Sequence, residues 1–239
     1  SKVFSISYKD RAAILMGGQK ADVAFWYDRS KGRMMTSTYY TAAMPGWARS
    51  FNEGKWIEKN VPDSWIRLKP EDVYEQYGPD ALEGEGLWDG KTTFPHVFNT
   101  EKKAAQVFDS PYGNLMLLDF ARRAIEGEKL GQRGATDLLC ISLSTTDNIG
   151  STFGPNSQEM VDNLIRLDLA LGEFFDELVA RLGKQNILII LAGDHGVMPL
   201  PEYITTVEHG SARRFDNKKE VQQKLKQLDS LVRIEMNVS

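Results

Sequence analysis

The chain has 239 residues, of which 41% are hydrophobic, and this suffices for one large α/β domain but not for two equal domains. Its formal net charge is -4 with acidic and basic residues interspersed, which argues against a nucleic-acid groove or a membrane-surface patch. No apolar run approaches the ~20 residues of a membrane span, and we expect no signal peptide in the chain. The single cysteine, Cys140, excludes a disulfide framework, and the first residue, Ser1, indicates a processed or truncated product.

The amino-terminal segment is expected to form a strand that leads directly into a helix. Residues 2–7 alternate in the manner of a strand, and residues 9–15 follow with a helical pattern that ends at a pair of glycines. Lys9 and Arg11 are placed where the strand ends and the helix starts, a position where free backbone N–H groups help to bind an anion. Taken by themselves, these residues favour the plainer interpretation of a solvated helix start.

The next segment combines a hairpin with a long irregular stretch. Residues 23–27 and 34–40 are strand-like runs joined by a six-residue turn. From residue 45 to about residue 111, Pro, Trp and Gly are frequent, which indicates a loop-rich insertion over the sheet edge that forms part of a substrate pocket. His96 lies in this stretch, directly after a proline, and is expected to be a structural residue rather than a metal ligand.

The second half of the chain carries the strongest pattern. Two short apolar runs, 138–143 and 187–191, lack polar alternation and are predicted to be strands buried on both faces of a parallel sheet. The helix between them is predicted to begin at Asn156 or Ser157 and to end at Gly183. This is a βαβ unit, and its right-handed crossover brings the carboxyl ends of both strands to one edge, where open α/β sheets bind ligands.

Three potential metal ligands follow these two strands. Asp147, Asp194 and His195 are expected to converge at the sheet edge, and carboxylate oxygens with an imidazole nitrogen are ligands that suit zinc. Gly193 and Gly196 allow the backbone bend that both Asp194 and His195 need to reach one ion. For the Asp-His-Gly run alone, a polar turn after a buried strand is an equally good interpretation.

The remaining segments are simpler. Residues 114–125 are predicted to be a helix, residues 198–202 a loop, residues 218–228 a polar helix and residues 231–238 a last strand. We assign residues 1–239 to a single partial domain, with a core of residues 1–24 and 112–239 and the hairpin and insertion at residues 25–111.

Several motifs resemble those of one known family. The run Ser-Thr-Thr-Asp-x-x-Gly-x-x-Phe-Gly-Pro-x-Ser at residues 144–157 and the run Gly-Asp-His-Gly at residues 193–196 are similar to those of the alkaline phosphatase superfamily. The branch they resemble is the type I phosphodiesterase and nucleotide pyrophosphatase branch, with most likeness to the phosphate-irrepressible alkaline phosphatases. The likeness is collinear over most of the chain and extends through residues 7–11, 24–28, 36–40 and 110–114.

The resemblance implies a three-layer αβα sandwich with a mainly parallel central sheet, present here in part, and a two-zinc esterase. In this family a metal pair ~3.5–4 Å apart clamps an in-line displacement at phosphorus. By position, Asp147 is expected to bind the leaving-group zinc, and Asp194 and His195 the zinc that holds the nucleophile. Lys9 and Arg11 match the Lys-x-Arg pair that contacts the transferred phosphoryl group, and two cations favour a phosphate monoester dianion.

The chain departs from the family pattern in three places. Ser151 stands where the family has a zinc-binding His, and a neutral hydroxyl is a much poorer ligand than imidazole. The family's nucleophile and a further metal-binding Asp lie upstream of the Lys-x-Arg strand, at which this chain begins. The last zinc-binding His lies more than a hundred residues after the Asp-His-Gly motif, and His209 matches a stretch that holds no ligand.

We therefore expect the full-length parent to hydrolyse phosphate monoesters or diesters with zinc, and the present chain to be inactive because it lacks the nucleophile. The alternative is a degenerate relative that serves as a binding or interaction module, which Ser151 favours. A third reading is sulfate or phosphonate ester hydrolysis, against which the Lys-x-Arg match argues weakly. The expected partners are small phosphate esters, without nucleic acid or a membrane span, and the resemblance implies a periplasmic or secreted location. The oligomeric state is left open.

Overall fold

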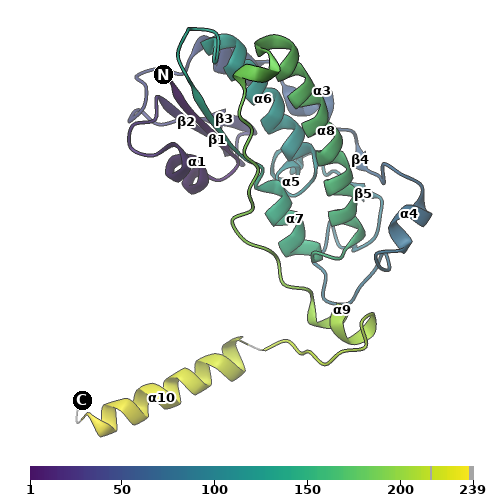
Figure 1. Cartoon of the computed structure of the whole chain (residues 1–239). Helices are drawn as coiled ribbons and strands as arrows, with labels where there is room; N and C mark the ends of the chain where they lie inside the picture. The colour runs from purple at the N-terminus through teal and green to yellow at the C-terminus, as the bar shows by residue number, and fades with distance from the viewer. Residues whose placement is uncertain (216, 237–239) are drawn as a thin grey trace. The chain divides into compact units, whose positions relative to one another are not determined.

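The computed structural model describes residues 1–215 and 217–236 of the chain. It divides into two compact units, Ser1–Pro199 and Leu200–Ser239, each of which is considered by itself. The first unit contains the sheets and eight α-helices (Figure 1). Within the described residues, no helix is both long and apolar enough to span a bilayer.

The main sheet has four strands in the order β3-β2-β1-β6. Strands β1 (Val3–Ser7), β2 (Val23–Asp28) and β6 (Leu138–Ser142) are mutually parallel, and the short β3 (Arg33–Met35) returns antiparallel from β2. The apolar, strongly β-forming composition of β1 and β2 suits a sheet covered on both faces. The predicted α/β class with a mainly parallel sheet is confirmed.

Helices cover both faces of this sheet. Ser5 of β1 faces α1 (Asp10–Gly17), where a Cβ added to Gly17 would lie 3.1 Å from the Ser5 Cβ. Neighbouring residues of a strand point to opposite faces, so Phe25, aligned with Ile6, faces the other layer. There its ring meets the ring of Phe120 on α6 (Tyr112–Glu128) at 5.1 Å. Sheet and helices thus form three layers, with the main core on the α6 face.

The region between β3 and α6 is more ordered than the loop-rich insertion that we expected. Its elements are α2 (Gly46–Glu53), α3 (Trp56–Asn60), β4 (Ser64–Trp65), α4 (Glu71–Glu75), β5 (His96–Val97) and α5 (Lys103–Val107). Strands β4 and β5 form a small antiparallel sheet, and His96 is buried at 1% exposure with its Nε2 2.7 Å from Glu159 Oε1. Short helices were missed because five to eight residues are too few to show helical periodicity.

Two helices follow β6. Helix α7 (Thr145–Phe153) starts directly after the strand, and α8 (Gln158–Leu182) begins at the N-cap Ser157, whose Oγ accepts a hydrogen bond from Met160 N. The predicted start of α8 and its end before Gly183 are confirmed. Figure 1 shows α6, α7 and α8 stacked beside the sheet. Helix α7 was not predicted, because the residues after β6 were interpreted only as a ligand-bearing loop.

The predicted strand at residues 187–191 is wrong. After the 3₁₀ turn Lys184–Asn186 the chain has no ladder partner, and Leu188 and Ile190 are 85% and 81% exposed. The βαβ unit is therefore not formed within the described residues. Strand β6 is likewise not buried on both faces, since Leu138 is 52% exposed and Cys140 is half-buried. An apolar run forms a strand only where a neighbouring strand accepts its backbone hydrogen bonds.

The second unit is helical. It contains α9 (Pro201–Thr206), a π-helical turn (Asn217–Val221) and α10 (Gln222–Glu235). The loop predicted for residues 198–202 ends earlier than expected, because Pro201 occupies the first turn of α9, where a missing N–H costs nothing. The polar helix predicted at residues 218–228 is present in α10. The strand predicted at residues 231–238 is wrong for residues 231–235, which belong to α10, and residue 236 is not in a strand either. Residues 237–239 lie outside the described residues.

Candidate functional site

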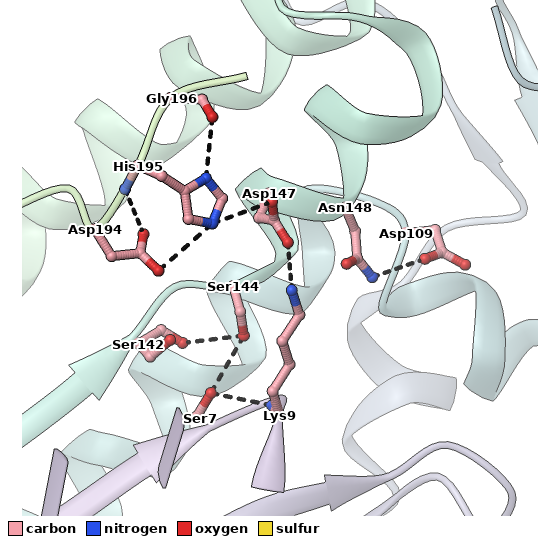
Figure 2. A network of polar contacts seen from close by, with 10 residues as sticks. All are labelled: Ser7, Lys9, Asp109, Ser142, Ser144, Asp147, Asn148, Asp194, His195 and Gly196. Atoms are coloured by element: carbon pink, nitrogen blue, oxygen red, sulfur yellow. Dashed lines mark hydrogen bonds and ion pairs between the residues drawn. The ribbon is translucent and has the colours of Figure 1, made fainter. Parts of the chain in front are cut away.

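The candidate site lies at the carboxyl edge of the parallel sheet, where β1 and β6 end. Asp147 is in the first turn of α7, three residues into a helix that begins immediately beyond β6. A carboxylate is favourable at this position because the helix dipole is positive there. Lys9, at the end of β1, directs its Nζ onto Asp147 Oδ2, and this ion pair spans 138 residues of sequence (Figure 2).

His195 faces the same carboxylate from the segment that follows α8. Its Nε2 is 3.9 Å from Asp147 Oδ1 and 3.6 Å from Asp194 Oδ2. The other ring nitrogen, Nδ1, lies 3.0 Å from the carbonyl oxygen of Gly196, so Nδ1–H donates there and Nε2 keeps the lone pair that can take up a proton or a metal ion. The hydrogen bond to Gly196 and then the charges of Asp194 and Asp147 raise the pKa of His195 above its usual value.

The structure brings Asp147 and Asp194 near His195, although the βαβ unit from which their convergence was expected is not formed within the described residues. They do not surround a common point, since no group of three or more His, Cys, Asp or Glu side chains in the described part of the chain is placed to hold a metal ion. The donor chemistry nevertheless fits zinc, with two carboxylates and an imidazole whose second nitrogen is already hydrogen-bonded. Asp194 is exposed, and its Oδ1 accepts a hydrogen bond from the backbone N–H of His195 at 3.1 Å.

Lys9 is held in place through its backbone. Its N–H donates to Ser7 Oγ at 3.0 Å, and Ser7 Oγ lies 3.2 Å from the hydroxyl of Ser144, the residue before α7. Ser144 Oγ is also 3.5 Å from the carbonyl oxygen of Ser142 at the end of β6. Ser7 is fully buried, and Figure 2 shows the hydroxyls of Ser7 and Ser144 beside the Lys9 side chain. The ends of two strands and the start of α7 are thus joined.

The other two predicted residues are less engaged. Arg11 is exposed in the first turn of α1, and no ion pair joins it to Asp147 or Asp194 within the described residues. Ser151 is on α7, one helical turn after Asp147, and its side chain is exposed. Residues four apart on a helix share a face, so a ligand at position 151 can reach toward the same ion as Asp147.

Sequence reasoning missed the contacts that position α7. Asn148 Nδ2 donates to Asp109 Oδ1 at 3.0 Å, and Asp109 Oδ2 accepts from Arg29 at 2.8 Å. Burial raises the pKa of Asp109, while the Arg29 charge and the Asn148 hydrogen bond oppose the shift. Asp109 and Asn148 are 39 residues apart, and no local sequence pattern indicates a contact between them.

A second set of contacts comes from the start of α6. Asn114 Nδ2 lies 3.1 Å from the hydroxyl oxygen of Thr146 and 3.1 Å from Asn163 Oδ1 on α8. Gly113 permits the close approach of α6 to α7, because a Cβ there would lie 2.5 Å from the hydroxyl oxygen of Thr145. The Ser-Pro-Tyr-Gly-Asn run at residues 110–114 thus positions Thr146, the residue before Asp147.

The fold and the site define an α/β protein in which a lysine, carboxylates and an imidazole lie at the carboxyl edge of the sheet. A model of the family described as type I phosphodiesterase / nucleotide pyrophosphatase matches residues 3–237. The chain belongs to this family, and the resemblance drawn from the motifs is confirmed.

Two curated relatives are alkaline phosphatases. The chain is 42% identical over 208 residues to alkaline phosphatase PhoV of Synechococcus elongatus, covering 85% of this chain and 38% of that protein. It is 38% identical over 248 residues to alkaline phosphatase PafA of Elizabethkingia meningoseptica, covering 99% of this chain and 45% of that protein. The crystal structure of wild-type PafA matches with a TM-score of 0.84 at 36% identity, over 95% of this chain and 44% of that one. The chain thus spans less than half the length of these relatives.

Proposed function

We propose that the protein to which this chain belongs hydrolyses phosphate esters in a metal-dependent reaction. The observation that carries the proposal is the meeting of Lys9, Asp147 and His195 at the carboxyl edge of the sheet, from three separate segments. The family membership and the alkaline phosphatases among the relatives support the same reaction class. Small phosphate esters are the proposed substrates, and a periplasmic or secreted location is proposed from the resemblance.

In this proposal Asp147 belongs to one zinc site, and Asp194 and His195 to another. Bound zinc supplies Lewis acidity toward a phosphoryl oxygen and lowers the pKa of a coordinated hydroxyl. The residues of this chain orient the imidazole and bind the phosphoryl oxygens. The Nδ1 contact with Gly196 fixes the His195 ring, and Lys9 and Arg11 supply positive charge for the nonbridging oxygens of the phosphoryl group.

The nucleophile is proposed to lie outside this chain, so the isolated chain is expected to be inactive. The alternative of a degenerate binding module rests on one observation, the serine at position 151 on the helix that carries Asp147. A serine hydroxyl leaves the Asp147 site one ligand short of the family pattern.

Substitutions in the full-length protein test the proposal. Lys9→Ala and Arg11→Ala should each lower kcat/KM for an aryl phosphate by about two to three orders of magnitude, because charge on the transferred phosphoryl group is left uncompensated. Metal content by mass spectrometry should show zinc that Asp147→Asn reduces. The matched control is Asp168→Asn, which removes an exposed carboxylate on α8. Wild-type rates in the Lys9 and Arg11 variants, or an absence of bound zinc in the wild type, would contradict the proposal.

A further inference from the structure

Asp147 is approached by two cationic or metal-binding partners at once. The Lys9 ammonium contacts Oδ2, and His195 Nε2 faces Oδ1 at 3.9 Å. A carboxylate has about four lone-pair sites, and the Lys9 contact occupies part of those on Oδ2. The lysine contact therefore uses part of the coordinating capacity of Asp147.

The contact is not that of a freely moving surface lysine. The side chains of Lys9 and Asp147 are 37% and 29% exposed, and the backbone of Lys9 is fixed by the buried Ser7 hydroxyl. Ser7 in turn meets Ser144, which immediately precedes α7. The base of the lysine and the helix that carries Asp147 are thus held together by hydroxyl contacts that do not involve the ion pair, and Lys9 can swing only through its side-chain torsions.

We propose that Lys9 and a divalent metal ion compete for the Asp147 carboxylate, so that metal binding turns the Lys9 ammonium away and frees it for an anionic ligand. The inference deepens the proposed function and rests on it. Like charges cannot share one carboxylate cheaply, because an ammonium and a divalent ion a few ångströms apart repel each other at the low effective dielectric of a half-buried site. The same displacement would make the Lys9 ammonium available to an anionic ligand only when the metal site is filled.

Arg11 provides an internal comparison. It carries the same charge and belongs to the same Lys-x-Arg motif, but it is exposed on α1 and no ion pair joins it to Asp147 in the described part of the chain. A general electrostatic effect on metal affinity would therefore appear in variants of both residues and would weaken in salt. Direct competition would appear for Lys9 alone.

The test measures zinc affinity without any substrate. Zn²⁺ is titrated into the metal-stripped full-length protein against a chromophoric chelator at fixed pH and about 0.15 M salt, where exposed charges more than about 8 Å apart are screened. The Asp147 site is identified as the binding step that Asp147→Asn abolishes. Lys9→Met keeps an unbranched apolar stem without the charge, Arg11→Met is the matched control, and Lys9→Arg restores the cation. Circular dichroism checks that each variant is folded.

Lys9→Met should tighten zinc binding at the Asp147 step by about three- to fivefold, near the upper end of the range expected for loss of a half-exposed ion pair. Arg11→Met should change it by less than about twofold, and Lys9→Arg should return it toward the wild-type value. Equal effects of Lys9→Met and Arg11→Met, or no effect of either, would overturn the competition while leaving the zinc site intact. Absence of any Asp147-dependent zinc binding would overturn the competition together with the proposed metal dependence.

Discussion

Ser151 lies one helical turn after Asp147 on α7, so its side chain is on the same helix face as the proposed metal ligand. Substituting Ser151→His in the full-length protein should raise zinc stoichiometry or phosphatase activity if the site has lost a ligand, because imidazole binds zinc far better than a hydroxyl does. Metal analysis and aryl phosphate hydrolysis of the variant are the measurements. Thr152→His places the same side chain one residue further along α7 and is the control. An unchanged Ser151→His protein would show that the site works without a ligand at this position.

The buried pair of His96 and Glu159 makes a different kind of prediction. Burial lowers the pKa of His96 to about 4 and raises the pKa of Glu159 to about 8. Both shifts favour a neutral pair in which the carboxyl proton of Glu159 is donated to His96 Nε2. Asp80 and Asp162 oppose ionisation of Glu159 further, and Arg67 works against them.

The buried Glu159 should make the chain less stable as the pH rises. Between about pH 4.5 and pH 8 the folded state keeps the Glu159 proton that the unfolded state releases, so this residue lowers the free energy of unfolding as the pH rises. His96 acts in the opposite direction between about pH 4 and pH 6.5, because there the unfolded state binds a proton that the folded imidazole does not, so the net fall is expected between about pH 6.5 and pH 8. Glu159→Gln mimics the protonated acid, so the fall in its free energy of unfolding with pH should be smaller than that of the wild type by about 2 kcal/mol. Urea unfolding at pH 5.5 and pH 8.5 measures it, with the exposed Glu173→Gln on the same helix as control. The same pH dependence in Glu159→Gln as in the wild type would disprove the neutral pair.

At the scale of elements, α8 serves as the support to which the insertion is attached. The fully buried Asp162 accepts hydrogen bonds from Trp65 Nε1 at 2.6 Å, from Leu68 N at 2.7 Å and from the Tyr74 hydroxyl at 2.6 Å. Arg166, one turn later on α8, completes the set at 2.6 Å. One carboxylate thus connects β4, the loop after it, α4 and α8.

Asp162→Ala should destabilise the chain by about 3 kcal/mol or more, because four donors lose their acceptor and the Arg166 charge loses its partner. Denaturant unfolding followed by tryptophan fluorescence reports the change, since Trp65 lies in the same cluster. Limited proteolysis should cut the variant first between β4 and β5. Asp168→Ala on the exposed face of α8 should stay within about 0.5 kcal/mol of the wild type. If Asp162→Ala lowered the free energy of unfolding by no more than about 0.5 kcal/mol, the supporting role of Asp162 would be contradicted.

At the scale of the first compact unit, the segment at residues 187–191 is an exposed apolar surface. Leu188, Ile190 and Leu191 are 85%, 81% and 76% exposed, and an apolar run with unpaired backbone groups is a template for association. Leu188→Lys with Ile190→Lys should keep the 239-residue chain monomeric at concentrations where the wild type associates, as judged by size-exclusion chromatography with light scattering. Lysines placed at exposed Leu225 and Leu228 of α10 are the control, and equal behaviour of both double variants would refute a specific role for this segment.

The sequence by itself determined the elements whose pattern is local. Strands β1, β2 and β6 and helices α1, α6 and α8 were predicted because their apolar periodicity and end signals lie within each segment. It also determined the family, since the motifs around Asp147 and His195 are specific in composition and order, and the matching family model confirms the assignment.

Only the tertiary structure decided which segments meet. The Lys9–Asp147 ion pair, the Ser7–Ser144 contact and the Asp109–Asn148 hydrogen bond join residues that are 138, 137 and 39 positions apart, and no local pattern encodes such distances. It also decided that residues 187–191 form no strand, because strand formation depends on a neighbour that offers hydrogen bonds and not on β propensity alone. Local chemistry thus specifies which groups a chain possesses, whereas packing decides which of them can act on one ligand.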